Sequence, residues 1–320
     1  MRYQKSRKKF TKIVVLLLLI AIETVIVIWQ QGLEKVEEEC YQPVGRLVEV
    51  NSHQVHMVEK GKGKPIVVFL TGSGTPCAYT DFYPLQQELS KSAKTITFDR
   101  PGFGWSEKTQ VERTIDHQVM ELEKILSYTS KAKSYVLVAH SLASLEALRF
   151  AQQYPEQVKG IVFLDCGSPE FYKEDSETKS VAINRACAFL RVSGLNRLVS
   201  GLVKPSFVGE DIRYKNLPEE LKKLDLSMYN RFLGDPDNLE NILMMNENAE
   251  TVLSNKKKMD IPFLVLSSDQ DTGWTETQKQ LGEWSTNYQQ IVLKDSSHYI
   301  HWSNTDEVIA LINDFIKDKH

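Results

Sequence analysis

The chain alternates between short apolar runs and amphipathic helical patterns along most of its length. Segments 65–70 (PIVVFL) and 135–139 (YVLVA) are continuously apolar, as expected for strands buried on both faces of a sheet. Such alternation predicts an α/β fold with a doubly wound, mainly parallel sheet and right-handed connections. The other expected strands are 46–50, 53–58, 95–98, 160–164, 263–266 and 290–293, and the expected helices lie near 81–91, 114–128, 142–154, 275–286 and 305–317.

Residues 169–258 break this alternation, because they are rich in helical patterns and contain no convincing strand. We interpret this interval as an inserted helical cap between two core segments, 46–168 and 259–320. We expect the cap to cover the carboxyl ends of the strands, where ligands of open α/β sheets bind, and to supply an apolar pocket there. The apolar side chains that suggest this pocket are Val181, Phe189, Leu190, Leu195 and Leu198.

Residues 13–29 (IVVLLLLIAIETVIVIW) form an apolar run interrupted only by Glu23 and Thr24. As a helix the run spans roughly 25 Å, the short end of what crosses a bilayer core. A secretory signal peptide is the alternative, but its apolar region is usually about 7–15 residues and precedes small residues for cleavage. The run instead ends in Trp-Gln-Gln, which favours an uncleaved anchor over residues 1–30 and a linker over 31–45.

The charges on either side of the apolar run differ in sign. Residues 1–12 hold six basic and no acidic side chains, whereas 34–39 (EKVEEE) are mostly acidic. The positive-inside rule therefore predicts a single-pass protein of the cell membrane with a cytoplasmic N-terminus and an extracytoplasmic folded body. The whole chain has a net charge of −3, so the remainder after residue 12 sums to −9. Such an acidic body offers no extended cationic surface, and nucleic acid is not an expected partner.

The chain has four cysteines, Cys40, Cys77, Cys166 and Cys187. Outside the cytoplasm they have three possible full disulfide pairings, and they are equally compatible with buried apolar packing, which we favour. Their spacings match no metal site, and we expect neither a metal nor a cofactor.

A serine lies where the strand at 135–139 is followed by a helix. The pattern Ala139-x-Ser141-x-Ala143 has small residues on both sides of the serine, as a sharp strand-to-helix turn requires. On such a turn the hydroxyl of Ser141 stands clear at the positive end of the helix, where it can act as a nucleophile. The alternative is that Ser141 only caps the helix.

A glycine-rich turn, residues 71–76 (TGSGTP), follows the strand at 65–70. Backbone N–H groups in such a turn can point at an anion. We expect the N–H groups of Ser73 and Leu142 to form an oxyanion hole. A phosphate-binding loop is the alternative, but neither of its glycine spacings occurs here.

The last two expected strands are followed by acidic and imidazole side chains. Asp269 and Asp271 come after 263–266, and His298 and His301 come after 290–293. Ligands of open α/β sheets bind beyond the carboxyl ends of the strands. The chain order Ser…Asp…His at these ends is the order of a hydrolytic triad.

From about residue 45 to 318 the chain resembles a serine hydrolase of the α/β-hydrolase fold, of the capped type. Residues 99–106 (DRPGFGWS) match the D-x-P-G-x-G-x-S turn of that family. The segment that begins SSHYIH is similar to its G-H-x-x-H stretch, with Ser297 in place of glycine, and TGSG stands where many members have H-G-x-G.

This resemblance implies that Ser141 is the nucleophile, His298 the general base and Asp271 the acid that orients it. Asp269 and Asp165 are alternative acids, the latter because some members place the acid after the preceding strand, and His301 is an alternative base. The implied reaction is cleavage of a small-molecule carboxylic ester or similar acyl substrate through an acyl-enzyme.

Two other functions fit the same resemblance. One is a non-catalytic binding or sensor protein that has kept the fold, and the other is a proline-releasing aminopeptidase, whose elbow is typically richer in Gly and Trp than AHSLA. A serine at the elbow disfavours the members with an aspartate nucleophile, the epoxide hydrolases and haloalkane dehalogenases. The substrate depends on the shape of the pocket, which this reasoning leaves open.

Overall fold

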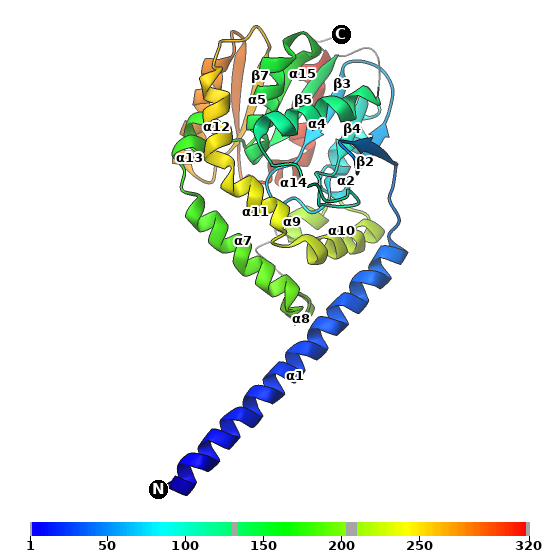
Figure 1. Cartoon of the computed structure of the whole chain (residues 1–320). Coiled ribbons are helices and arrows are strands. Elements are labelled where there is room, and N and C mark those ends of the chain that lie inside the picture. The colour runs from blue at the N-terminus through cyan, green and yellow to red at the C-terminus, as the bar shows by residue number, and fades with distance from the viewer. Residues whose placement is uncertain (1, 130–133, 203–209, 318–320) are drawn as a thin grey trace.

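The computed structural model describes residues 2–129, 134–202 and 210–317. Within these residues the molecule is built on an eight-stranded sheet with strand order β1-β2-β4-β3-β5-β6-β7-β8 (Figure 1). Strands β1, β2 and β4 pair antiparallel, and all the other pairs are parallel. The strands are β1 Arg46–Val50, β2 His53–Lys60, β3 Ile66–Leu70, β4 Lys94–Phe98, β5 Tyr135–His140, β6 Val158–Leu164, β7 Phe263–Ser268 and β8 Tyr288–Leu293. The predicted α/β fold with a mainly parallel sheet is confirmed.

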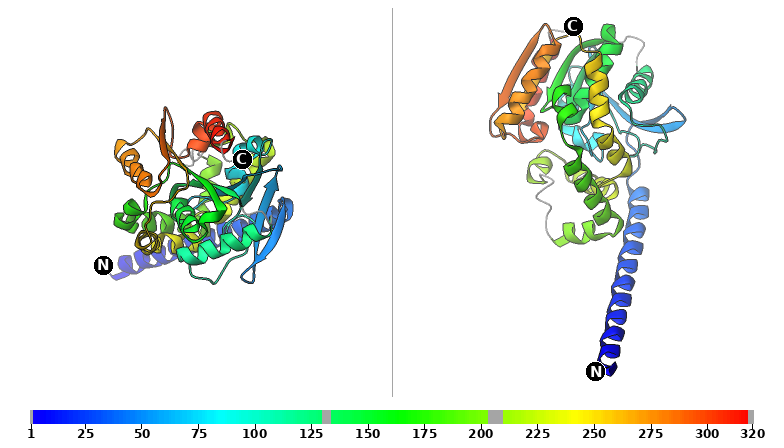
Figure 2. Two further views of the ribbon diagram at one scale, coloured as in Figure 1. Left: turned by 90° about the horizontal axis from the view of Figure 1, so that it is seen from above. Right: turned by 60° about the vertical axis from the view of Figure 1, so that its left-hand side comes forward.

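Helices pack on both faces of the sheet, and helix α1 projects from the body as an N-terminal arm (Figures 1 and 2). Their bounds are α1 Arg2–Cys40, α2 Ala78–Asp81, α3 Tyr83–Leu89, α4 Ile115–Ser127, α5 Ser144–Gln153, α6 Pro169–Glu174, α7 Glu177–Val192, α8 Leu195–Leu202, α9 Glu210–Tyr214, α10 Glu219–Phe232, α11 Pro236–Leu243, α12 Met245–Ser254, α13 Thr272–Gln278, α14 Ile300–Ser303 and α15 Thr305–Lys317.

The central strands are buried on both faces, and this explains their continuous apolar sequence. Successive side chains of a strand point to opposite faces. In β3, Val68 and Leu70 belong to a core shared with α4 and α5, whereas Val67 and Phe69 belong to a second core shared with α3 and α15. The two cores hold the sheet rigidly, so the loops at the carboxyl ends of β5, β6 and β8 are held in fixed relative positions.

Helices α6 to α12 lie between β6 and β7 in the chain, and we call residues 169–258 the helical insertion. Helices α6 and α12 pack on each other, and α12 reaches α4 and α5 of the core. Helices α7 to α10 lie below the sheet, on the side from which α1 projects (Figure 1).

Helix α1 is a single helix that continues through most of the segment expected to be a linker. Residues 31–40 of the expected linker continue this helix, so only residues 41–45 connect α1 to the first strand without helical structure. From Phe10 to Cys40 the helix is long and apolar enough to cross a membrane, with a mean hydropathy of 2.7 in its most apolar window and 6% of that window buried.

The four cysteines are free. Cys77 and Cys166 are buried among core residues, as the packing interpretation predicts, whereas Cys40 is exposed at the end of α1.

Candidate functional site

Ser141 lies on a strained turn at the end of β5. Its backbone φ is +54°, in the left-handed region that residues other than glycine rarely adopt. The chain then forms a 3₁₀ turn over Ser141–Ala143 and enters α5. A Cβ atom on Gly72 would lie 3.1 Å from the Cβ of Ser141, so glycine lets the 71–76 loop approach the turn closely. Sequence and structure agree that the Ser141 side chain stands at the junction of strand and helix.

His298 and Asp165 continue from Ser141 in a hydrogen-bonded row. The Nε2 atom of His298 lies 3.1 Å from the Oγ of Ser141, and its Nδ1 atom lies 2.8 Å from Oδ2 of Asp165. The three residues come from the ends of three strands, β5, β8 and β6, whose carboxyl ends meet at one edge of the sheet. A hydroxyl, an imidazole and a carboxylate in this row can transfer a proton from the hydroxyl to the imidazole.

Asp165 is buried and held from several sides. Its backbone φ is +50°, and its carboxylate accepts hydrogen bonds from the Ser268 N–H (2.7 Å), the Gln278 amide (2.9 Å) and the Trp274 indole N–H (2.9 Å). Burial alone would raise the pKa of Asp165, but its hydrogen bonds with His298, Ser268 and Gln278 outweigh that effect and lower the pKa. The carboxylate therefore stays ionised beside the imidazole.

Asp271, the carboxylate expected beside His298, lies elsewhere, and this pairing is corrected. It is exposed at the start of α13, where its side chain accepts hydrogen bonds from the N–H groups of Gly273 (2.8 Å) and Trp274 (3.2 Å). Asp269 is not the partner of His298 either, because its carboxylate accepts hydrogen bonds from the N–H groups of Asp295 and Ser296. Both aspartates organise loops, and the alternative Asp165 is the one that contacts the imidazole.

The loop that is expected to stabilise an oxyanion is anchored by a half-buried arginine. Arg100 donates to the carbonyl oxygen of Thr71 at 2.9 Å and to Glu146 at 2.6 Å. Ser73 donates through its hydroxyl to Asn238 of the helical insertion at 2.8 Å. Ser73 and Leu142, whose N–H groups are the expected donors, both line the same cleft beside Ser141.

The motif at 99–106 has a structural role in this neighbourhood. The carboxylate of Asp99 accepts hydrogen bonds from the N–H groups of Ala78 (2.6 Å) and Trp105 (3.2 Å) and contacts the Nδ1 atom of His56 at 2.7 Å. Asp99 is thus used in holding loops together, and its place in the family motif does not make it a group that touches substrate.

A small cleft, with a volume of about 30 Å³, lies between the 71–75 loop, the start of α5 and the helical insertion. The insertion contributes mainly amide side chains to it, namely Asn238, Asn241 and Asn248, together with Met245. The apolar residues from which we expected an acyl pocket do not line this cleft, and two of them, Phe189 and Leu198, are exposed. That expectation is corrected: the walls that the insertion supplies are largely polar.

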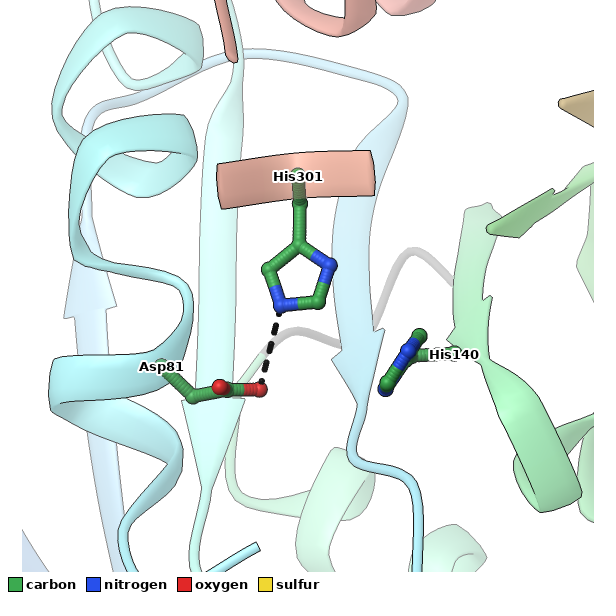
Figure 3. Close-up of side chains that lie close together, drawn as sticks. All are labelled: Asp81, His140 and His301. Carbon is green, nitrogen blue, oxygen red and sulfur yellow. Dashed lines mark ion pairs between the residues drawn. The ribbon is translucent and has the colours of Figure 1, made fainter. Parts of the chain in front are cut away.

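Asp81, His140 and His301 form a buried cluster next to the row (Figure 3). The Nε2 of His301 is 3.5 Å from one oxygen of Asp81, and the other oxygen binds Arg213 at 2.7 Å. Burial lowers the pKa of both imidazoles, whereas contacts with His301 and Arg213 lower the pKa of Asp81 to about 2 despite its burial.

The sequence offered His301 as an alternative base, but its side chain is fully buried and its Nε2 atom faces Asp81. The ligand atoms of the cluster lie within 4.8 Å of one another and are of types that bind Zn²⁺. The guanidinium of Arg213, however, already neutralises the carboxylate and would repel a cation placed beside it. We therefore interpret the cluster as a structural support for His298, because the Nε2 atom of His140 lies 3.2 Å from the backbone oxygen of His298.

Comparison with known proteins places these observations in a family. Residues 65–305 match the model of the alpha/beta hydrolase fold family. The Bacillus subtilis protein YbdG is 26% identical over 85% of this chain and 86% of its own length. A cis-3-alkyl-4-alkyloxetan-2-one decarboxylase of Shewanella oneidensis is 23% identical over 84% of this chain and 86% of its own. The structure of the epoxide hydrolase CorEH superposes with a TM-score of 0.68 at 16% identity, over 87% of this chain and 99% of that one.

Proposed function

The chain belongs to the α/β-hydrolase fold family, and on that premise we propose that it is a serine hydrolase that cleaves carboxylic-ester-type substrates. The observation that supports this proposal most is the row Ser141–His298–Asp165, with contacts of 3.1 Å and 2.8 Å. In this proposal Asp165 takes the role that the sequence assigned to Asp271.

The first half of the reaction forms an acyl-enzyme. The Oγ of Ser141 attacks the carbonyl carbon of the ester while His298 Nε2 takes the hydroxyl proton. The N–H groups of Ser73 and Leu142 stabilise the negative charge on the carbonyl oxygen. When the intermediate collapses, the bond to the alcohol oxygen breaks and His298 protonates the leaving alcohol. Asp165 stays ionised throughout and stabilises the imidazolium.

The second half repeats these steps with water. His298 takes a proton from water, the resulting hydroxide attacks the acyl carbon, and Ser141 leaves with the proton from the imidazole. The amide-rich cleft suits substrates with hydrogen-bonding groups near the ester, because the side chains of Asn238, Asn241 and Gln118 line it.

We also propose that α1 anchors the protein in the cell membrane, with the catalytic body outside. In support, the apolar window of α1 is 6% buried, so no protein core explains its composition. The six bases before the apolar run and the acidic segment after it favour this direction. Protease added to intact spheroplasts is expected to digest the body. Digestion that begins only after lysis of the membrane contradicts this orientation.

A series of p-nitrophenyl esters tests the proposed reaction. The full chain in detergent is expected to release p-nitrophenol with an initial burst, because an activated ester acylates Ser141 faster than water releases the acyl group. Ser141→Ala is expected to abolish both the burst and the turnover, whereas Ser254→Ala, a change on the exposed end of α12, is expected to leave them unchanged. Equal turnover by the two variants would refute Ser141 as the nucleophile.

A further inference from the structure

The turn between α7 and α8 of the helical insertion lies directly against α1. Gly194 forms this turn with a φ of +74°. A Cβ atom at Gly194 would lie 2.9 Å from the side chain of Ile26 and 3.2 Å from that of Gln30. The next residue, Leu195, lines an apolar hollow whose other walls are α1 residues from 19 to 28. The turn therefore contacts the apolar part of α1.

Ion pairs fix this contact at the end of α1 nearer the body. Arg197 of α8 makes a two-pronged pair with Glu37 of α1, with distances of 2.6 Å and 2.7 Å, and Arg231 of α10 pairs with Glu38 at 2.8 Å. The Arg197 side chain is only 8% exposed, so the first pair is shielded from solvent. Two-pronged pairs of arginine and carboxylate restrict geometry as well as distance. The helical insertion is thus held at a defined position along the axis of α1.

These contacts place the turn at the boundary of the apolar run. The run ends at Trp29, a residue type that favours the membrane–water interface. Gly194 contacts both Ile26, three residues inside the run, and Gln30, one residue beyond it, so at about 1.5 Å per residue the turn lies at the boundary and reaches about 5 Å into the apolar zone. Side chains of interfacial helices are typically buried about 5–10 Å deep in the headgroup and acyl boundary.

Several apolar side chains near this turn are exposed. On α7, Ile183, Phe189 and Val192 are 54%, 64% and 60% exposed, and on α8 Leu198 is 37% exposed. These residues belong to the same two helices that meet at Gly194, and Val192 is separated from it by one residue. An exposed apolar group of this kind marks an interaction surface, and the adjoining apolar helix indicates that lipid is what covers it.

We propose that the α7–α8 turn, with Phe189, Val192 and Leu198, is embedded in the outer leaflet beside α1. The partner of this surface is the lipid bilayer. The inference rests on the proposed anchoring by α1 and extends it to a second element, which comes from the catalytic body. Because α11 and α12 of the same insertion line the cleft, its opening is held close to the lipid surface, where esters that partition into membranes are concentrated.

Fluorescent labels at single cysteines test this proposal on the full chain in phosphatidylcholine vesicles. The background for labelling is Cys40→Ser with Cys187→Ser, since the other two cysteines are buried. An environment-sensitive label is placed by Val192→Cys, by Ile22→Cys in α1, or by Met120→Cys. Met120 is 48% exposed on α4 and serves as the matched control. Lipids brominated on their acyl chains then quench any label that lies in the bilayer.

The labels at positions 192 and 22 are expected to lose most of their fluorescence in brominated vesicles, while the label at 120 keeps it. If position 22 is quenched and position 192 behaves like 120, the proposal is wrong although the anchor stands. If neither is quenched, the anchor and this inference both fail, whereas the ester assay with Ser141→Ala remains an independent test of the hydrolase proposal. A label at 192 that is shielded from water but not quenched indicates a second protein copy and also overturns the proposal.

Discussion

Both carboxylate oxygens of Asp165 have hydrogen-bond partners, and replacing Asp165 by asparagine turns one of these acceptors into a donor. Oδ1 accepts hydrogen bonds from the Ser268 N–H and the Gln278 amide, which an amide oxygen also accepts. Oδ2 faces the Nδ1 atom of His298 and the Trp274 indole N–H, and an amide NH₂ in its place has no lone pair for them. The imidazole is then expected to carry its proton on Nε2, where it no longer accepts the proton of Ser141.

We expect Asp165→Asn to lower kcat by about 10⁴-fold, the size of effect known for a triad acid that leaves the wrong histidine tautomer. This corresponds to about 5 kcal/mol of lost transition-state stabilisation. The amide also leaves the indole N–H of Trp274 unpaired, so the free energy of unfolding is expected to fall by about 1–3 kcal/mol. Steady-state hydrolysis of p-nitrophenyl acetate gives kcat, and circular dichroism checks that the variant is folded.

The matched control is Asp271→Asn. Asp271 caps α13 at an exposed position, and asparagine caps helices about as well as aspartate, so activity and stability are expected to stay near those of the wild type. If Asp271→Asn abolishes turnover while Asp165→Asn stays active, the assignment of the acid from geometry is refuted.

Two further predictions concern the support of the site. Gly104→Ala is expected to destabilise the protein by about 2 kcal/mol or more, because the new Cβ would lie 2.0 Å from the Asp99 carboxylate and the backbone φ of +55° disfavours a side chain. Thermal unfolding measures this effect, and Gly32→Ala, whose new Cβ would have no atom within 4 Å, is the control. Asp81 has a pKa lowered to about 2, so its ionisation contributes roughly 2 kcal/mol above its unfolded pKa of about 4 and loses this as pH falls toward 2. The difference in unfolding free energy between wild type and Asp81→Asn, measured in denaturant, is therefore expected to shrink between about pH 6 and about pH 3, and a constant difference would contradict this.

The sheet could be predicted from the sequence because burial on both faces leaves little choice of residue. Runs such as PIVVFL and GIVFL contain no polar residue, so neither face can be exposed to solvent. They correspond closely to β3 and β6 in the structure. The turn at Ser141 was also predictable, since small neighbours at Ala139 and Ala143 are a steric requirement of the close approach between strand and helix.

The sequence could not identify which aspartate pairs with His298, because three aspartates follow neighbouring strands. Which of them meets His298 depends on how the chain leaves each strand. Asp165 directly follows β6 with a left-handed backbone that turns its side chain inward, whereas Asp271 comes after a further bend and begins a helix. The position of Asp165 immediately after a buried strand was the available signal.

The cleft was mispredicted for a different reason. Helical periodicity shows that a helix has an apolar face but not what that face contacts. Phe189 was expected to face the site, and it is exposed on α7 instead. Asn238 and Asn241 gave no signal, since asparagines in a helix more often face solvent than line a cleft.

The central claim is that Ser141 forms a covalent bond with an acyl carbon in the course of the reaction. The most direct measurement is labelling of the full chain with a fluorophosphonate probe, followed by mass spectrometry of the peptide that contains residue 141. We predict a single adduct on Ser141, lost in Ser141→Ala and strongly slowed in Asp165→Asn. An adduct on another serine, or undiminished labelling of Ser141→Ala, would contradict the claim.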